Sequence, residues 1–395
     1  MTGLLGSRTA VVVALGAAQT LAWASSYYLP AILAVPMARE LGVPTSWVFG
    51  AFSAGLVVSA LLGPAAGRAI DARGGRPVLA LSSLVLAGGL ALLGVAGGMP
   101  MLTLGWLVLG AGMAMGLYDA AFSALAYLYG RDARGPITGI TLIAGFASTV
   151  GWPLSGLLDA EFGWRSACFV WAGLHLLVGL PLNLFLIPAA SRVPQGSSVP
   201  AKPTQVVGDE GRVPRHTMAL LAFTFAATWF VAGSMAAHLP RLLEGAGAAP
   251  AAAIAAGALI GPAQVAARLL EFGFLRRFHP LVSARLAALA HPIGAATLLT
   301  IGGPAAAAFT LLHGAGNGVL TIAKGTLPLA IFGPAGYGLR QGILGAPSRL
   351  LQAGAPLIFG LVIEGYGATA ALMLSTGLSL AAFAALMALR GAGGS

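Results

Sequence analysis

Long apolar runs follow one another along almost the whole chain, and short polar or glycine-rich stretches separate them. A run of about 20 apolar residues is long enough to cross the hydrocarbon core of a bilayer as a helix. The pattern therefore predicts an all-α membrane protein with twelve spanning helices. Their expected ranges are 10–36, 47–70, 77–98, 101–129, 136–159, 166–188, 217–239, 251–272, 282–301, 304–331, 340–362 and 368–390.

One long polar segment interrupts this pattern, at 189–216, and it is rich in serine, proline and charged residues. Such a composition is typical of a flexible linker. We therefore predict an N-terminal six-helix bundle at 1–188, a cytoplasmic linker at 189–216, and a C-terminal six-helix bundle at 217–395.

The composition supports a membrane location, because 58% of the residues are hydrophobic and only 8% are charged. A soluble protein has about 25% charged residues. With the N-terminus placed in the cytoplasm, fifteen Lys and Arg residues fall on the cytoplasmic side of the spans and three fall on the other side. This bias predicts a multi-pass protein of the cytoplasmic (inner) membrane with both termini cytoplasmic.

The net charge of +10 is explained by these basic loops, so no nucleic-acid partner is expected. A single cysteine, Cys168, excludes an internal disulfide and a cysteine-based metal site. No cofactor and no metal are predicted.

A glycine- and arginine-rich loop separates the second apolar run from the third. It contains Gly67, Asp71, Gly74 and Arg76, at the spacing Gly, three residues, Asp, two residues, Gly, one residue, Arg. This loop resembles the conserved cytoplasmic motif between helices 2 and 3 of major facilitator superfamily (MFS) transporters. The resemblance implies the MFS fold, with two pseudo-symmetric six-helix bundles and a central cavity lined by helices 1, 4, 7 and 10.

The two halves of the chain also repeat each other. When the sequence is shifted by 203 residues, Gly151 and Pro153 of the fifth run fall on Gly354 and Pro356 of the eleventh. Arg68 and Asp71 are similarly echoed by Arg268 and Glu271. Related bundles joined by a linker suit a transporter whose site lies between its halves.

Charged residues inside the predicted spans are few. Each costs roughly 3 kcal/mol or more within a bilayer, so each is a functional candidate. Lys324 and Arg349 against Asp119 leave a surplus of one positive charge in mid-membrane, which favours an anionic or zwitterionic substrate.

Helical spacing and the resemblance together give the candidate site. The predicted substrate ligands are Lys324, Arg349, Asn317, Thr321, Tyr27, Trp23, Gln19 and Thr228. The predicted proton-coupling residues are Asp119 and Glu271. The predicted gating residues are Gly67, Asp71, Gly74, Arg76 and Arg268, and Asp71 is expected to contact the start of helix 11.

Other interpretations of these residues stay open at this point. Asp119 is alternatively a structural partner of a nearby cation, and Trp23 with Tyr27 is alternatively an ordinary packing pair. Arg268 with Glu271 is alternatively the second copy of the Asp71 gate. His175 and His291 lie on peripheral helices and are interpreted as packing or interface residues.

The sequence contains no nucleotide-binding loop and no metalloprotease motif, which argues against direct ATP drive and against an enzyme. A transporter-like sensor is a further alternative, but no signalling domain is recognisable. We therefore predict a monomeric secondary active transporter that moves a small organic anion by alternating access, coupled to protons. The alternative is proton-driven efflux of drugs or other amphipathic solutes. The expected partners are a small-molecule substrate, protons and the lipid bilayer.

Overall fold

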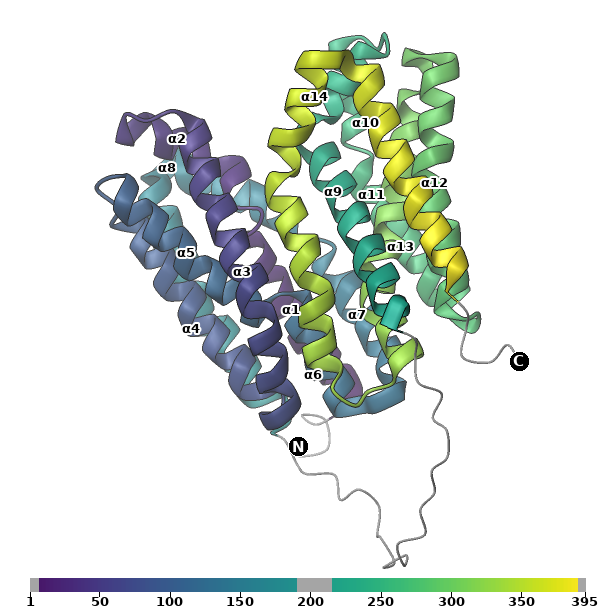
Figure 1. Ribbon diagram of the computed structural model, residues 1–395. Coiled ribbons are helices and arrows are strands. Elements are labelled where there is room, and N and C mark those ends of the chain that lie inside the picture. The colour runs from purple at the N-terminus through teal and green to yellow at the C-terminus, as the bar shows by residue number, and fades with distance from the viewer. Residues whose placement is uncertain (1–6, 190–214, 390–395) are drawn as a thin grey trace, which may run out of the picture.

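The computed structural model describes residues 7–189 and 215–389, and these residues form helices joined by short turns. The helices gather into two bundles that stand side by side (Figure 1). The predicted linker falls almost wholly outside the described residues. The first bundle ends at residue 189 and the second begins at residue 215. We call the end of the molecule at which these two residues lie the linker end.

The first bundle comprises eight α-helices. They are α1 (Arg8–Ser25), α2 (Pro30–Leu41), α3 (Thr45–Arg73), α4 (Gly75–Gly94), α5 (Met99–Gly116), α6 (Tyr118–Tyr129), α7 (Arg134–Ala144) and α8 (Ala147–Leu174). A 3-10 turn (Gly130–Ala133) precedes α7, and two π-helical turns (His175–Gly179 and Leu182–Leu186) extend α8.

The second bundle comprises six α-helices. They are α9 (Arg215–Gly245), α10 (Pro250–Gly257), α11 (Ile260–Gly273), α12 (Pro280–Ile301), α13 (Ala306–Phe332) and α14 (Tyr337–Ala388). Short 3-10 turns (Leu275–Arg277 and Gly303–Ala305) precede α12 and α13.

Nine helical stretches of the described chain are long and apolar enough to cross a membrane. Two of them are much longer than one crossing: Met99–Leu186 and Tyr337–Ala388. Each turns sharply at a glycine with positive φ, Gly163 (φ 78°, ψ 159°) and Gly367 (φ 85°, ψ 168°). Only glycine adopts this conformation at little cost. The two turns lie at matching places in the two halves, and the arrangement is consistent with twelve crossings.

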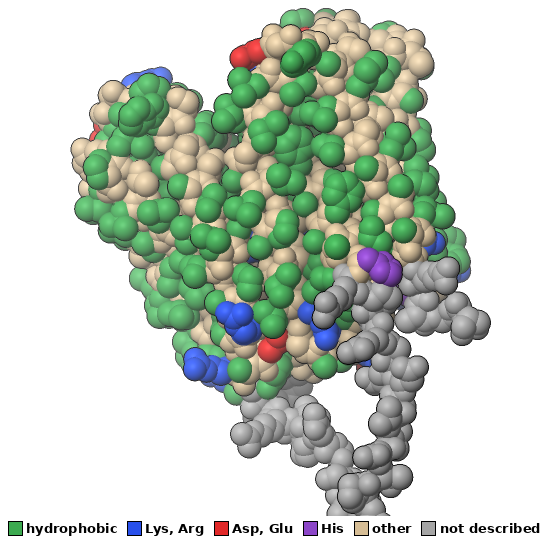
Figure 2. Space-filling model, in the orientation of Figure 1, with side chains coloured by type: hydrophobic (Ala, Val, Ile, Leu, Met, Phe, Trp, Pro, Cys, Tyr) green, Lys and Arg blue, Asp and Glu red, His purple; other side chains and the backbone are tan. Residues whose placement is uncertain are grey.

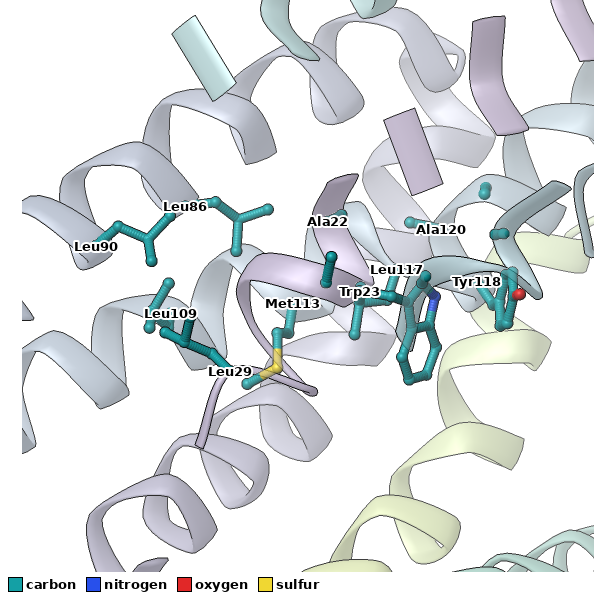
Figure 3. Close-up of a cluster of buried hydrophobic side chains, with 14 of the residues drawn as sticks. Ala22, Trp23, Leu29, Leu86, Leu90, Leu109, Met113, Leu117, Tyr118 and Ala120 are labelled. Atoms are coloured by element: carbon teal, nitrogen blue, oxygen red, sulfur yellow. The ribbon is translucent and has the colours of Figure 1, made fainter. Parts of the chain in front are cut away.

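Each bundle has its own apolar core. In the first bundle, Leu90 of α4 faces Leu109 of α5 (Figure 3), and Met113 of α5 belongs to the same core. In the second bundle the core is centred on Phe309 and Phe359. Large apolar side chains also cover the outer surface (Figure 2), and Leu177 keeps 78% of its surface exposed. Soluble monomers rarely expose large contiguous apolar patches, so we assign this outer face to the lipid.

Four predicted spans are broken rather than continuous. The chain is non-helical between α1 and α2, α5 and α6, α7 and α8, and α10 and α11. Backbone groups freed within a membrane must find partners inside the protein. Two such partners are side chains: Gln19 donates to the carbonyl oxygen of Gly116 at the α5–α6 break, and Arg268 of the second bundle donates to that of Thr141 near the α7–α8 break.

The two bundles meet most closely where α3 lies against α14. Gly63 and Gly67 of α3 face Gly338 and Gly342 of α14, and a Cβ atom on Gly67 would overlap the carbonyl oxygen of Gly338. Small residues allow two membrane helices to bring their backbones together. The glycine of the sequence motif is thus a contact surface between the bundles.

We predict that Gly67→Ala lowers the thermal unfolding midpoint of the purified protein by several degrees. The added Cβ atom would overlap backbone atoms of Gly338 and Leu339, and backbone cannot rotate away as a side chain can. The matched control is Gly88→Ala in α4, where an added Cβ meets nothing within 4 Å. An equal midpoint for the two variants would show that the close approach of α3 and α14 is not a constraint.

Candidate functional site

One carboxylate of the first bundle is shared by two cations of the second. Asp119 of α6 lies 2.7 Å from Arg349 Nη2 of α14 and 3.0 Å from Lys324 Nζ of α13. Gln341 Nε2 donates to Asp119 Oδ1 at 3.3 Å and to the carbonyl oxygen of Lys324 at 3.2 Å. We call Asp119, Lys324 and Arg349 the ion cluster.

The local fold explains the position of Asp119. The fourth span breaks at Leu117, so Asp119 lies in the first turn of the new helix α6. The partial positive charge of a helix N-terminus stabilises a carboxylate there. On the facing helix, Gly345 leaves room, because a Cβ atom at this position would lie 2.6 Å from Asp119 Oδ2.

All three charged side chains are buried, with residue exposures of 5 to 7%. Both cations contact the same carboxylate. The predicted formal surplus of one positive charge remains, because one negative charge faces two positive ones. Removing one partner of a buried ion pair costs about 3–5 kcal/mol, so Asp119 ties the two bundles together in this conformation.

Aromatic rings form the wall beside the ion cluster. Trp23 of α1 packs against Tyr118, with ring centres 4.9 Å apart (Figure 3), and against Tyr27 at 5.3 Å. The centre of the Trp229 ring lies 5.0 Å from Lys324 Nζ, within the range of a cation–π contact. Gln352 Nε2 donates to the Tyr27 hydroxyl at 2.7 Å and bridges the bundles once more.

The cavity at the ion cluster is small, with about 20 Å³ of free space, which is room for a water molecule and not for a larger solute. Two polar groups that line it, Trp23 Nε1 and Ser59 Oγ, have no hydrogen-bond partner among the described residues. In this conformation the ion cluster is therefore closed to solutes larger than water.

Several predicted ligands lie elsewhere. Gln19 Nε2 donates to the carbonyl oxygen of Gly116 inside the first bundle, and Thr321 donates to the carbonyl oxygen of Asn317 within α13. Thr228 and Asn317 line a second cavity inside the second bundle. The structure brings Lys324, Arg349, Tyr27 and Trp23 to the ion cluster but does not bring these four there.

The predicted gate residue Asp71 lies at the linker end. Its two oxygens accept the backbone N–H groups of Gly338 and Leu339, each at 2.8 Å, at the start of α14. This is the expected contact with the start of helix 11. Gly74 ends α3 with φ 78°, and Arg76 follows in the first turn of α4.

A second set of contacts at the linker end repeats this arrangement between another pair of helices, α11 and α7. Glu271 of α11 pairs with Arg134 at the start of α7, with 2.9 Å between Oε1 and Nη2. Arg268 Nη1 donates to the carbonyl oxygen of Thr141 at 3.0 Å, where α7 is about to end. Glu271 thus lies with the gate contacts and not with Asp119, which favours its interpretation as the second copy of the Asp71 gate.

A histidine outside the spans completes this end. His279 Nδ1 accepts the N–H of Leu281 at 3.2 Å and so caps the start of α12. Burial lowers the pKa of His279, and the charges of Arg134 and Arg285 add to the shift. The lowered pKa keeps the ring neutral, as an acceptor at Nδ1 requires.

Sequence reasoning missed part of the site. Ser59, Trp229 and Gly345 were not singled out, because none carries a charge and only their places in the fold bring them to the ion cluster. Gln341 and Gln352 stand on the same helical stripe as Arg349, and that spacing was the available signal.

This arrangement of two helical bundles with an apolar outer face, a buried ion cluster and two sets of contacts at the linker end between them is that of a polytopic membrane transporter. The family model of the Major Facilitator Superfamily matches residues 15–323. The chain belongs to the Major Facilitator Superfamily, and it is a multi-pass membrane protein and a secondary transporter of small molecules rather than an enzyme.

Three solved structures are similar over nearly the whole chain. The human organic anion transporter MFSD10 (TETRAN) is 20% identical, with a TM-score of 0.70, and the match covers 96% of this chain and 98% of that one. The proton:xylose symporter XylE bound to 6-bromo-6-deoxy-D-glucose is 13% identical, with a TM-score of 0.74 and coverage of 96% and 95%. The transporter FucP in the outward conformation is 16% identical, with a TM-score of 0.68 and coverage of 95% and 97%. At these sequence identities the similarity shows the fold alone. A search of curated proteins found no match.

We predict that Asp71→Asn slows transport roughly tenfold while the protein still folds, because the helix terminus loses a charge interaction worth about 1–2 kcal/mol. The measurement is solute flux in proteoliposomes together with the unfolding midpoint of the purified variant. Asp132→Asn is the control, since Asp132 is exposed at the same end. Transport by Asp71→Asn at the rate of the control would contradict a gating role.

Proposed function

We propose that the protein is a proton-coupled secondary active transporter of organic anions that works by alternating access. The observation that supports this most is the ion cluster, in which a single carboxylate from one bundle satisfies two cations from the other. The carboxylate has the charge and the geometry that a substrate carboxylate would have at the same cations.

Asp119 acts in this proposal as an internal substitute for the substrate. When Asp119 takes up a proton, Arg349 and Lys324 lose their buried counter-charge. Two uncompensated cations within a membrane protein are costly, so an incoming anion then binds strongly. The guanidinium of Arg349 suits a carboxylate or another oxyanion, since it donates two parallel hydrogen bonds, and Lys324 adds a compact charge.

The surroundings favour an anion with an apolar or aromatic body. Trp23, Tyr27, Tyr118 and Trp229 present ring surfaces around the ion cluster. Ring contacts contribute roughly 0.5–1.5 kcal/mol per pair beyond the area they bury. The unused donors of Trp23 and Ser59 add places for the polar atoms of such a solute.

Alternating access follows from where the bundles touch. At the linker end the Asp71 and Glu271 contacts hold the bundles together. Figure 2 shows a notch between the bundles at the opposite end. Release of both gates lets the linker end open while the ion cluster stays near the pivot. The basic loops support a cytoplasmic position for the linker end and both termini, and we propose the cytoplasmic (inner) membrane as the location. We also propose that the protein is a monomer built of two six-helix halves.

The main alternative is proton-driven efflux of drugs, in which a membrane-embedded acid attracts lipophilic cations. The ion cluster argues against drug efflux, because Asp119 is already paired with two cations and has no free negative charge to attract a third. The similarity to an organic anion transporter concerns the fold alone at 20% identity.

We predict that thermal-shift screening of the purified protein detects stabilisation by aromatic carboxylates such as benzoate and none by benzyltrimethylammonium, which has a similar body and the opposite charge. Arg349→Lys should weaken binding of the best anion roughly tenfold or more, because one of the two parallel hydrogen bonds is lost. Arg165→Lys is the control, since Arg165 pairs with Glu40 far from the ion cluster. Tight binding of the ammonium compound, unchanged in Arg349→Lys, would assign the protein to drug efflux.

We predict a different outcome for Asp119→Asn. The amide keeps the shape of the carboxylate but carries no titrating proton, so anion binding should become independent of pH between about pH 5 and 8. The same anion should raise the unfolding midpoint more in this variant than in the wild type, because it supplies the missing counter-charge. Asp159→Asn is the control. Unchanged pH dependence in Asp119→Asn would leave Asp119 a structural residue only.

A further inference from the structure

A second cluster of buried polar side chains lies inside the second bundle, away from the ion cluster. His291 of α12 and His313 of α13 face each other with 3.0 Å between their Nδ1 atoms. His291 Nε2 lies 3.0 Å from the hydroxyl of Ser375 in α14. The three residues are 6, 5 and 0% exposed, so they are part of the interior rather than of the lipid-facing surface.

The hydrogen bonds determine where the protons are. Ser375 donates its hydroxyl hydrogen to the carbonyl oxygen of Leu372 at 2.9 Å, so Ser375 accepts from His291 Nε2–H. His291 Nδ1 then has a lone pair, and the hydrogen between the rings belongs to His313 Nδ1. A neutral imidazole with a hydrogen on Nδ1 has a lone pair on Nε2. His313 Nε2 is therefore free to take up a proton.

A small cavity lies beside this pair. It is lined by His291 and His313 together with Thr228, Asn317 and Ser379, and it has about 20 Å³ of free space. This is room for about one water molecule and too little for an organic solute. Hydroxyl and amide groups around it offer the two to four polar partners that a buried water needs. The cavity fits a water that delivers a proton.

No charged side chain lines this cavity in the described part of the chain. The facing polar groups are Thr228 from α9, Asn317 from α13, and Ser375 and Ser379 from α14; α12 contributes His291 itself. Lys324 lies eleven residues further along α13 than His313, about 16 Å along the helix. The ring of Phe309 stacks on His313, with centres 6.1 Å apart, and meets His291 edge-on at 5.4 Å. An aromatic ring attracts a neighbouring cation.

We propose that the His291–His313 pair is a proton-binding site of its own, separate from Asp119. A hydronium ion in the cavity gives one proton to His313 Nε2, so that an N–H bond forms, an O–H bond breaks and a neutral water remains. The resulting charge of +1 is shared, because the proton between the two Nδ1 atoms can pass to His291. The pair binds one proton in total, since a second would place two like charges 3.0 Å apart.

This site links protonation to the packing of three spans. His291, His313 and Ser375 belong to α12, α13 and the part of α14 that follows the turn at Gly367, and α13 also carries Lys324. The interpretation of His291 as a packing residue is therefore incomplete. Proton binding by the pair does not depend on which solute the protein carries.

The test is a histidine NMR titration of the purified protein in micelles without any substrate, with the rings assigned through single His→Gln variants. Between about pH 4 and 8, we expect the Cε1–H signals of His291 and His313 to shift together with one midpoint. In His313→Gln the signal of His291 should lose this shift. Independent midpoints for the two rings, or no shift of either, would overturn the proposal.

The matched control is His175, which is also buried and also bonds to a serine, with 2.7 Å between Nε2 and Ser25 Oγ, but has no second histidine as partner. Potentiometric titration gives a second measurement. The wild type should bind about one proton more over this range than the His291→Gln/His313→Gln double variant, and His175→Gln should match the wild type. Equal proton uptake by the wild type and the double variant would contradict the proposal, whatever the outcome for the carried anion.

Discussion

The structure depends on the buried ion cluster, in which one carboxylate is paired with two cations. Among the described residues, Asp119 is the one carboxylate that pairs with Arg349 and Lys324, and both cations belong to the opposite bundle. Buried charges are tolerated only when they are paired. The pairing therefore connects the two bundles, and it leaves one positive charge that an anionic solute is able to balance.

Other features of the fold serve this arrangement. The break in the fourth span places Asp119 at a helix N-terminus, and Gly345 leaves space for its carboxylate. Gly67 and Gly338 let the facing helices approach until their backbones touch, which brings the cations of the second bundle within reach. The two gates at the linker end are then close enough to form hydrogen bonds with helix termini.

The sequence was sufficient for the architecture and for part of the site. Long apolar runs, the loop with Gly67 and Asp71, and the repeat of the halves predicted a superfamily fold that the comparisons confirm. Charges inside spans pointed to Asp119, Lys324 and Arg349, because an intramembrane charge is rare enough to be informative. Their mutual contact and the role of Gly345 were not predictable, since each depends on the three-dimensional approach of segments more than 200 residues apart. Helical spacing was misleading for Asn317, which shares a stripe with Lys324 but lies in another cavity.

The central claim is that an anion replaces Asp119 at the two cations when Asp119 takes up a proton. Proton uptake during anion binding tests it most directly. The purified protein is mixed, in weakly buffered solution with a pH indicator, with the aromatic carboxylate that stabilises it best. The account predicts that about one proton is taken up for each anion bound, and that Asp119→Asn binds the anion without proton uptake. Anion binding by the wild type with no proton uptake would contradict it.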